Sequence, residues 1–410
     1  MIVPARLSAP LSDPGATPLT DLLRRPTPSG GRVLPQLDAL RGVAILAVFV
    51  QHLGDRFMPF VDAEAARALP AALAPWVLTV LHHAHWGVDL FFVLSGFSLA
   101  QGYLRAFEGG GPAPSARGFL RRRAARVLPG FYVAVLVTLG FHRWVLRAPG
   151  AAAALGVHLL VLQGYLAPGG IVLIGAAWSL TTEVGFYLLL PLLARPLLAR
   201  DAARPSRRFV VGATLTAAAW GSRALLHALV LEPGVRTGLL ELTQRRWIGS
   251  RLDEFVLGAL AAAAAGEIGR AGASARAARW APVAMATAAA ALVVGFRLEG
   301  EGYLRPGGSW PYALVATATA ALVLAATLSQ GAARRVLAAA PLRAVGVVSY
   351  GIFLYHQLAI GLAGSVLVAS GWWSLAANAV LALALAVAAG AASWIVVERP
   401  AMRWASGAPT

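Results

Sequence analysis

A histidine and an arginine stand near the two ends of one short apolar segment, LDALRGVAILAVFVQHL, which covers residues 37–53. On an α-helix, the eleven steps from Arg41 to His52 bring both side chains to one face, about 16 Å apart along the axis. Charged and titratable groups inside a membrane are costly, so their usual reason is function. The plainer alternative is that Arg41 reaches the lipid headgroups and His52 ends the span.

Asp89 is a carboxylate within a second apolar segment, WGVDLFFVLSGFSL. An intramembrane carboxylate needs a partner or a water-filled cavity, so we interpret Asp89 as a functional group. Ser95 and Gly96 follow near the middle of the segment. Ser95 is a candidate substrate contact, although a small-residue contact between two helices explains the Ser-Gly pair more simply.

Glu183 is predicted about one helical turn inside the outer membrane face, in the segment WSLTTEVGFYLLLP. Ser179 precedes it by four residues and Tyr187 follows it by four, so all three share one helix face. A buried glutamate can orient a histidine or act as a base, and its two neighbours are candidate substrate contacts. The alternative is a structural glutamate paired with an arginine such as Arg223, itself a candidate substrate contact.

A dense group of arginines lies in GFLRRRAARVLPGFY, between the second and third apolar segments. Arg123 and Arg126 are three residues apart and share a helix face, and Arg122 adjoins them. Guanidinium groups bind phosphate bidentately, so this cluster suits a ligand that carries phosphate. Ordinary anchoring on the cytoplasmic side is the alternative.

Further histidines give weaker signals. His356 ends the segment SYGIFLYH, seven residues after Ser349 and on the same helix face. It is a candidate substrate contact, with a structural hydrogen bond as the alternative. His82, His83 and His85 precede the second segment, but no other ligands stand at a spacing typical of zinc. We therefore predict no metal site.

The composition is that of a polytopic membrane protein. Of 410 residues, 58% are hydrophobic and 13% are charged, whereas a soluble protein has about 25% charged residues. The apolar segments predict an all-α transmembrane bundle of about ten spans. Their expected limits are 38–54, 86–105, 127–146, 177–198, 209–231, 252–267, 280–297, 311–329, 345–369 and 374–397. We interpret residues 151–176 as a re-entrant or interfacial piece, because the apolar part is too short to cross.

The basic residues alternate between the predicted connections. The inner segments hold 23 of the 35 arginines, and the outer segments hold ten, whose charge is largely balanced by acidic residues. By the positive-inside rule, both termini face the cytoplasm, and we expect a bacterial inner membrane. The net charge of +17 follows from this distribution and does not indicate nucleic-acid binding. We predict a cytoplasmic tail at 1–36, a transmembrane domain at 37–400 and a short tail at 401–410.

Six motifs in order resemble those of the acyltransferase-3 family of integral membrane O-acyltransferases. They are Arg41 with His52, WGVDLFFVLSGF at 86–97, the arginine pattern at 122–129, WSLTTEVGFY at 178–187, RLDEFVLGAL at 251–260 and SYGIFLYH at 349–356. The resemblance covers about residues 38–400 and implies about ten spans. It also implies an acyl-CoA co-substrate, often acetyl-CoA, and transfer of the acyl group to a hydroxyl of a carbohydrate or glycosylated metabolite.

The resemblance implies a role for each group. The anionic end of the CoA would bind Arg122, Arg123 and Arg126 at the cytoplasmic face. Arg41 would also bind CoA or, as the alternative, set the position of the first helix. His52 would take the proton of the acceptor hydroxyl as it attacks the thioester, and Glu183 or Asp89 would fix the tautomer of the imidazole. No tightly bound cofactor is expected. The sequence has no cysteine, which excludes a cysteine acyl-enzyme.

A transporter or flippase for a glycan or an anionic metabolite is the alternative function, because intramembrane charges also line transport paths. An acyltransferase releases free CoA, whereas a transporter works without a thioester donor. Helical periodicity alone does not separate the two classes, and the family resemblance favours the acyltransferase.

Reporter fusions test the predicted topology. The arginine distribution places Arg204 in the cytoplasm and Gly300 outside it. We expect fusions at these two positions to report opposite sides in intact cells. Fusions that report the same side would show that the number of spans between them is wrong.

Overall fold

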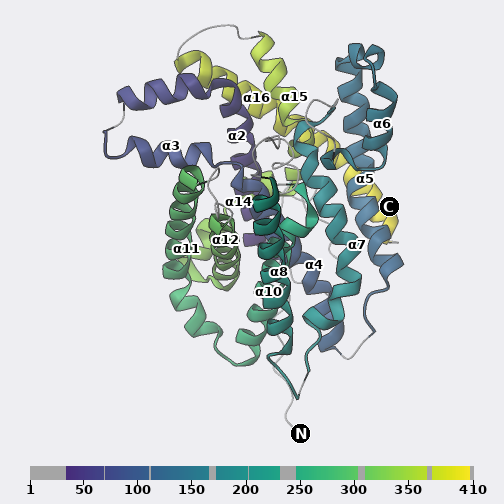
Figure 1. Ribbon diagram of the computed structural model, residues 1–410, viewed down its shortest axis with the longest axis vertical. Helices are drawn as coiled ribbons and strands as arrows, with labels where there is room; N and C mark the ends of the chain where they lie inside the picture. Colours follow the sequence, from purple (N-terminus) through teal and green to yellow (C-terminus); the bar gives the residue numbers. More distant parts are fainter. Residues whose placement is uncertain are drawn as a thin grey trace.

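Helices make up the regular structure of the described chain, as predicted. In this computed structural model the described residues are 34–68, 70–109, 112–165, 172–201, 203–230, 246–302, 310–366 and 372–406. No strand occurs in these ranges. The all-α prediction is therefore confirmed (Figure 1).

Eight helices of the described chain are long and apolar enough to cross a membrane. They are α2 (Pro35–Ala68), α4 (Trp86–Glu108), α5 (Ala116–Phe141), α7 (Trp178–Leu198), α8 (Arg207–Val230), α11 (Ser274–Gly302), α12 (Trp310–Leu328) and α16 (Trp372–Ser393). Two more helices, α14 (Ala340–Val347) and α15 (Ser349–Val366), meet at a bend of 79° and give a ninth span if taken together. The chain is therefore a polytopic membrane protein.

α10 (Ile248–Arg270) is the helix that corresponds to the sixth predicted span. Its charged residues keep it out of the apolar group, although its 23 residues, at a rise of about 1.5 Å each, are long enough to cross. With α10 included, each of the ten predicted spans falls on one of these helices.

The shorter elements connect or extend these helices. They are α3 (Ala74–His82), η1 (Arg143–Arg147), α6 (Ala151–Leu159), η2 (Gln163–Tyr165), η3 (Gly175–Ala177), α13 (Gly331–Leu337), the π-helical turn η5 (Trp394–Glu398) and α17 (Arg399–Ser406). Figure 1 shows α3 at one side of the bundle, where it packs against α2 and α11. α5, α6 and α7 lie on the opposite side.

α5 begins eleven residues before the predicted limit of the third span, at Ala116. The Ser115 side chain accepts a hydrogen bond from the Gly118 amide (3.2 Å) and so caps the start of the helix. The arginine cluster therefore lies on the first turns of α5 and not in a flexible connection.

The structure describes the two predicted tails only in part. α2 already begins at Pro35, and residues 1–33 of the predicted tail lie outside the described residues. At the other end, residues 401–406 are helical, because α16 continues through η5 into α17. Arg121 donates to the Ala405 carbonyl (3.2 Å), which fastens α17 against α5.

The described part of residues 151–176 contains no helix long enough to cross a membrane. Gln163 donates to the Ala177 carbonyl (2.7 Å), so the segment turns back onto the start of α7. Burial lowers the pKa of His158 and keeps its ring neutral. Its Nε2 then accepts a hydrogen bond from the Leu173 amide (3.1 Å).

Glycines let two pairs of helices approach backbone to backbone. A Cβ atom on Gly96 would lie 2.0 Å from the Phe255 carbonyl oxygen, and one on Gly258 would lie 2.1 Å from that of Val93. α4 and α10 can therefore be this close only because both positions lack a side chain. α2 and α14 approach in the same way at Gly346, where a Cβ would lie 1.7 Å from the Asp38 carbonyl oxygen.

We expect Gly96→Ala to destabilise the protein by about 1–3 kcal/mol, because the added methyl group forces α4 and α10 apart. Gly102→Ala is the matched control on the same helix, since a Cβ there meets nothing within 4 Å. Thermal unfolding of both variants in detergent measures the difference. Equal unfolding temperatures for the two variants would contradict this account of the packing.

Candidate active site

α2 and α15 bring His52 and His356 into contact. The His356 Nε2 atom lies 3.2 Å from His52 Nδ1, and the ring centroids are 4.8 Å apart in an edge-to-face arrangement. His356 is fully buried, whereas His52 keeps part of its ring accessible. Two segments far apart in the sequence therefore form one imidazole pair.

Backbone carbonyls determine which nitrogen of each neutral ring carries the hydrogen. His356 Nδ1 lies 2.8 Å from the Phe353 carbonyl oxygen, and His52 Nδ1 lies 2.9 Å from that of Val48. A carbonyl only accepts hydrogen bonds, so we assign the hydrogen to Nδ1 in both rings. His356 Nε2 can then accept from His52 Nδ1–H, and His52 Nε2 keeps a free lone pair that can take a proton.

The sequence predicted that Glu183 or Asp89 would fix the tautomer of His52. The contacts of His52 in the described chain are instead the Val48 carbonyl and His356. The carbonyl one turn earlier on the same helix already accepts from Nδ1, and both carboxylates bind other groups.

A pocket of about 140 Å³ lies between α2, α4, α5, α7 and α15. It is lined by Arg41, Val88, Phe91, Phe92, Ser95, Ser98, Leu99, Arg123, Arg126, Val127, Ser179, Leu180, Glu183, Tyr187, Ser349, Tyr350 and Phe353. His52 and His356 are not part of this lining, but Phe353 lies next to them, with its ring centroid 6.2 Å from that of His356. The pocket thus combines cations, hydroxyl groups and one carboxylate.

Three of the four arginines predicted to bind CoA line this pocket. Arg41 pairs with Asp38 (2.8 Å) and donates to the Ser98 hydroxyl (2.7 Å). Arg126 pairs with Glu398 (2.6 Å). The fourth, Arg122, is exposed and is not part of the lining.

Glu183 accepts two hydrogen bonds through one carboxylate oxygen. Ser95 Oγ lies 2.6 Å and Tyr187 OH 2.7 Å from Oε1. The predicted one-turn relation between Glu183 and Tyr187 is therefore present, and Ser95 makes a polar contact while Gly96 provides the close helix approach. Ser179 lines the same pocket and donates to the Ala176 carbonyl (3.2 Å).

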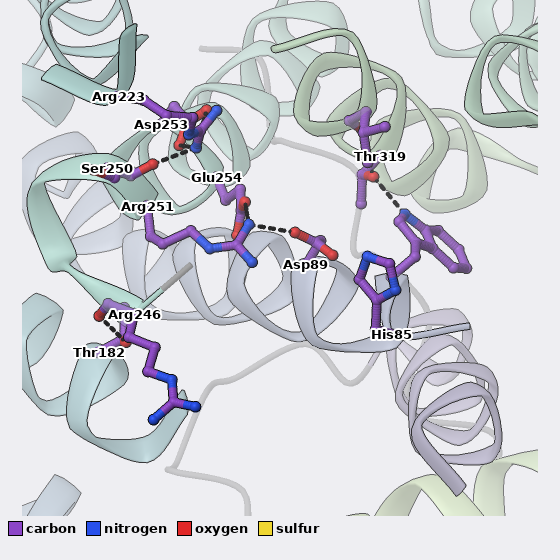
Figure 2. A network of polar contacts seen from close by, with 12 residues as sticks. His85, Asp89, Thr182, Arg223, Arg246, Ser250, Arg251, Asp253, Glu254 and Thr319 are labelled. Carbon is purple, nitrogen blue, oxygen red and sulfur yellow. Dashed lines mark hydrogen bonds and ion pairs between the residues drawn. The ribbon is translucent and has the colours of Figure 1, made fainter. Parts of the chain in front are cut away.

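Asp89 belongs to a buried network of charges on α4, α8 and α10, shown in Figure 2. Arg251 donates to Asp89 (2.6 Å) and also pairs with Glu254. Arg223 pairs with Asp253 (3.0 Å), so the alternative partnership of Arg223 with Glu183 is wrong. All five side chains belong to residues exposed by 5% or less. Such pairs hold helices together because a lone buried charge is costly.

Sequence reasoning missed three charged residues of this network, Arg251, Asp253 and Glu254. The sequence does contain an indication of them, because three charged residues within four positions begin the apolar segment RLDEFVLGAL. It also missed Glu398, which lies in ERP at the end of the last span. No sequence rule says which helix supplies the partner of a buried charge. No individual role was therefore predicted for these residues.

The structure thus shows a membrane protein with an imidazole pair and a nearby pocket lined with arginines, inside a bundle of apolar helices. The chain belongs to the acyltransferase-3 family, because the model of that family's acyltransferase domain matches residues 34–398. The resemblance inferred from the six motifs is therefore confirmed.

Known relatives match parts of the chain. Acyltransferase MdmB of Streptomyces mycarofaciens is 32% identical over 166 residues, which cover 39% of this chain and 38% of that protein. Nodulation protein 10 of Rhizobium leguminosarum bv. viciae is 30% identical over 29% of this chain and 35% of its own length. Protein 2 in the picA locus of Rhizobium radiobacter is 29% identical over 50% of this chain and 91% of its own. No solved structure matches the chain.

We expect Arg251→Met to reduce the free energy of unfolding by about 3–5 kcal/mol, because it leaves Asp89 and Glu254 buried without a cation. Arg270→Met is the matched control on the same helix, where the partly exposed pairs with Glu108 and Glu267 are worth about 1 kcal/mol or less. Denaturant unfolding in mixed micelles compares the two. A loss of similar size in both variants would contradict the structural role given to the network.

Proposed function

We propose that this acyltransferase moves an acyl group, in the simplest case acetyl, from cytoplasmic acyl-CoA to a hydroxyl of a carbohydrate or glycosylated metabolite. The pocket lined by three arginines, with Phe353 of its lining packed beside His356, carries the proposal. An acyl-CoA has anionic phosphates at one end and a thin thioester arm at the other. The arginines of the pocket can bind the phosphates, and the nearby histidine pair can supply a base close to the thioester.

One helix, α2, carries both a cation of the pocket and the proposed base. Arg41 lines the pocket, and His52 stands eleven residues further along the helix, about 16 Å away along its axis. The distance is set by one rigid helix and not by loops, which supports a fixed separation between the donor's anionic end and the reacting groups. We propose that the enzyme lies in the bacterial inner membrane with the arginines towards the cytoplasm.

The proposed chemical step is direct transfer. The acceptor hydroxyl oxygen attacks the thioester carbonyl carbon while His52 Nε2 takes the hydroxyl proton. The carbon–sulfur bond then breaks, and the CoA thiolate takes the proton to leave as free thiol. His52 Nδ1–H keeps its bond to the Val48 carbonyl or to His356 Nε2 throughout, which holds the ring in the productive tautomer.

Polar groups of the pocket are available for the substrates. Ser95, Ser179, Glu183 and Tyr187 line it, and we propose that they contact the thioester arm or the acceptor. Asp89 and Arg223 do not line it, so we assign them to the packing of α4, α8 and α10.

Comparison of a deletion strain with its parent tests this function. Mass spectrometry of surface glycans and secreted metabolites should show one product that is lighter by a single acyl group in the deletion strain. A product that keeps its acyl group but no longer reaches the outside would contradict the proposal and favour a transporter.

We expect His52→Ala to lower the transfer rate by about 100- to 10,000-fold, the usual contribution of a general base. CoA release by the purified protein, measured with a thiol reagent, gives the rate. His142→Ala is the matched control, because its Nδ1 also contacts the carbonyl one turn earlier (Thr138, 3.2 Å) but it lies outside the pocket. A His52→Ala protein that works at the control's rate would remove His52 from the chemistry.

A further inference from the structure

Arg123 is a partly buried cation that forms no ion pair within the described residues. Its Nε atom is buried and has no hydrogen-bond partner, and no ion pair involves its guanidinium among the described residues. The ring of Phe119 lies 6.0 Å away, and Glu183 lines the same pocket without forming an ion pair with it. Burying an uncompensated charge is costly, so this cation suits an anionic ligand.

Arg126 is bound on three sides, although it stands only three residues further along α5. Its Nη1 donates to Glu398 (2.6 Å), and its guanidinium lies 5.4 Å from the ring centroids of both Tyr350 and Trp394. Glu398 is fully buried. Arg126 therefore already has its counter-ion and two aromatic neighbours.

The π-helical turn η5 is what aims Glu398 at Arg126. Ser393 Oγ donates to Glu398 Oε1 (3.0 Å), five residues later in the chain. On an α-helix, residues five apart are rotated by about 140°, so this bond needs the wider turn. π-helical turns inside α-helices are rare and are frequently found at functional sites. The last helical rod, from α16 to α17, is thereby fastened to α5.

We propose that the two arginines have different roles. Arg123 binds an anionic group of the donor, and Arg126 holds the C-terminal helices against α5. This division of roles is the hypothesis to be tested. The inference rests on the proposed acyl-CoA donor and assigns one of its phosphate groups to Arg123. A guanidinium whose carboxylate is already in place adds little net charge for a second anion, whereas an unpaired guanidinium contributes its full charge.

Binding of CoA and of phosphate-free pantetheine, measured by titration calorimetry on the full-length protein in detergent, tests the division. Arg123→Ala should raise the Kd for CoA by about 10-fold or more and leave pantetheine binding within twofold. Its unfolding temperature should not fall, since the change breaks no ion pair. Arg117→Ala, an exposed position on the same helix, is the control and should change neither quantity.

Arg126→Ala should instead lower the unfolding temperature, because it leaves Glu398 buried and unpaired, while the Kd for CoA stays within about threefold. If that variant does not fold, Arg126→Met combined with Glu398→Met removes both charges together and serves for the same binding measurement. A rise in Kd of about 10-fold in either Arg126 variant would overturn the division.

The outcomes separate this inference from the proposed function. Wild-type protein that fails to bind CoA would overturn the proposed donor and the division together. Wild-type protein that binds CoA, with Arg123→Ala within twofold of it, would overturn the division alone.

Discussion

Every charge inside this bundle of apolar helices must meet an opposite charge or a ligand, and the architecture follows from that constraint. Arg251 meets Asp89 and Glu254, and Arg223 meets Asp253. These contacts connect α4 with α10 and α8 with α10. A helix as charged as α10 can therefore lie within the bundle.

Close backbone packing makes these pairings possible. Gly96 and Gly258 bring α4 and α10 into direct contact, so that the Arg251 side chain reaches Asp89. The same approach leaves Ser95 on the face of α4 that meets Glu183. α4 therefore contributes both to the pocket, through Ser95, and to the buried network of charges, through Asp89.

The sequence alone predicted the helical fold and some of the contacts in the candidate site. Apolar segments predicted the helices, and one-turn spacing predicted the relation of Glu183 to Tyr187. Spacing within one helix could not predict partners on another, so the contact of His52 with His356 was not foreseen. Asp89 resembled a catalytic carboxylate for the same reason, because its partner Arg251 lies on a distant helix.

The central claim is that the thioester arm of CoA enters the pocket, and the absence of cysteine from the chain allows a direct measurement. A single Ser95→Cys substitution places the sole thiol in the pocket, and an activated CoA disulfide can transfer its CoA sulfur to that thiol by exchange. Ser365→Cys, at an exposed position on α15, reports the background rate. Intact-protein mass spectrometry should show CoA attached to the Ser95→Cys protein well before the Ser365→Cys protein, and free pantetheine should compete. Labelling at Ser95→Cys no faster than at Ser365→Cys would contradict the account.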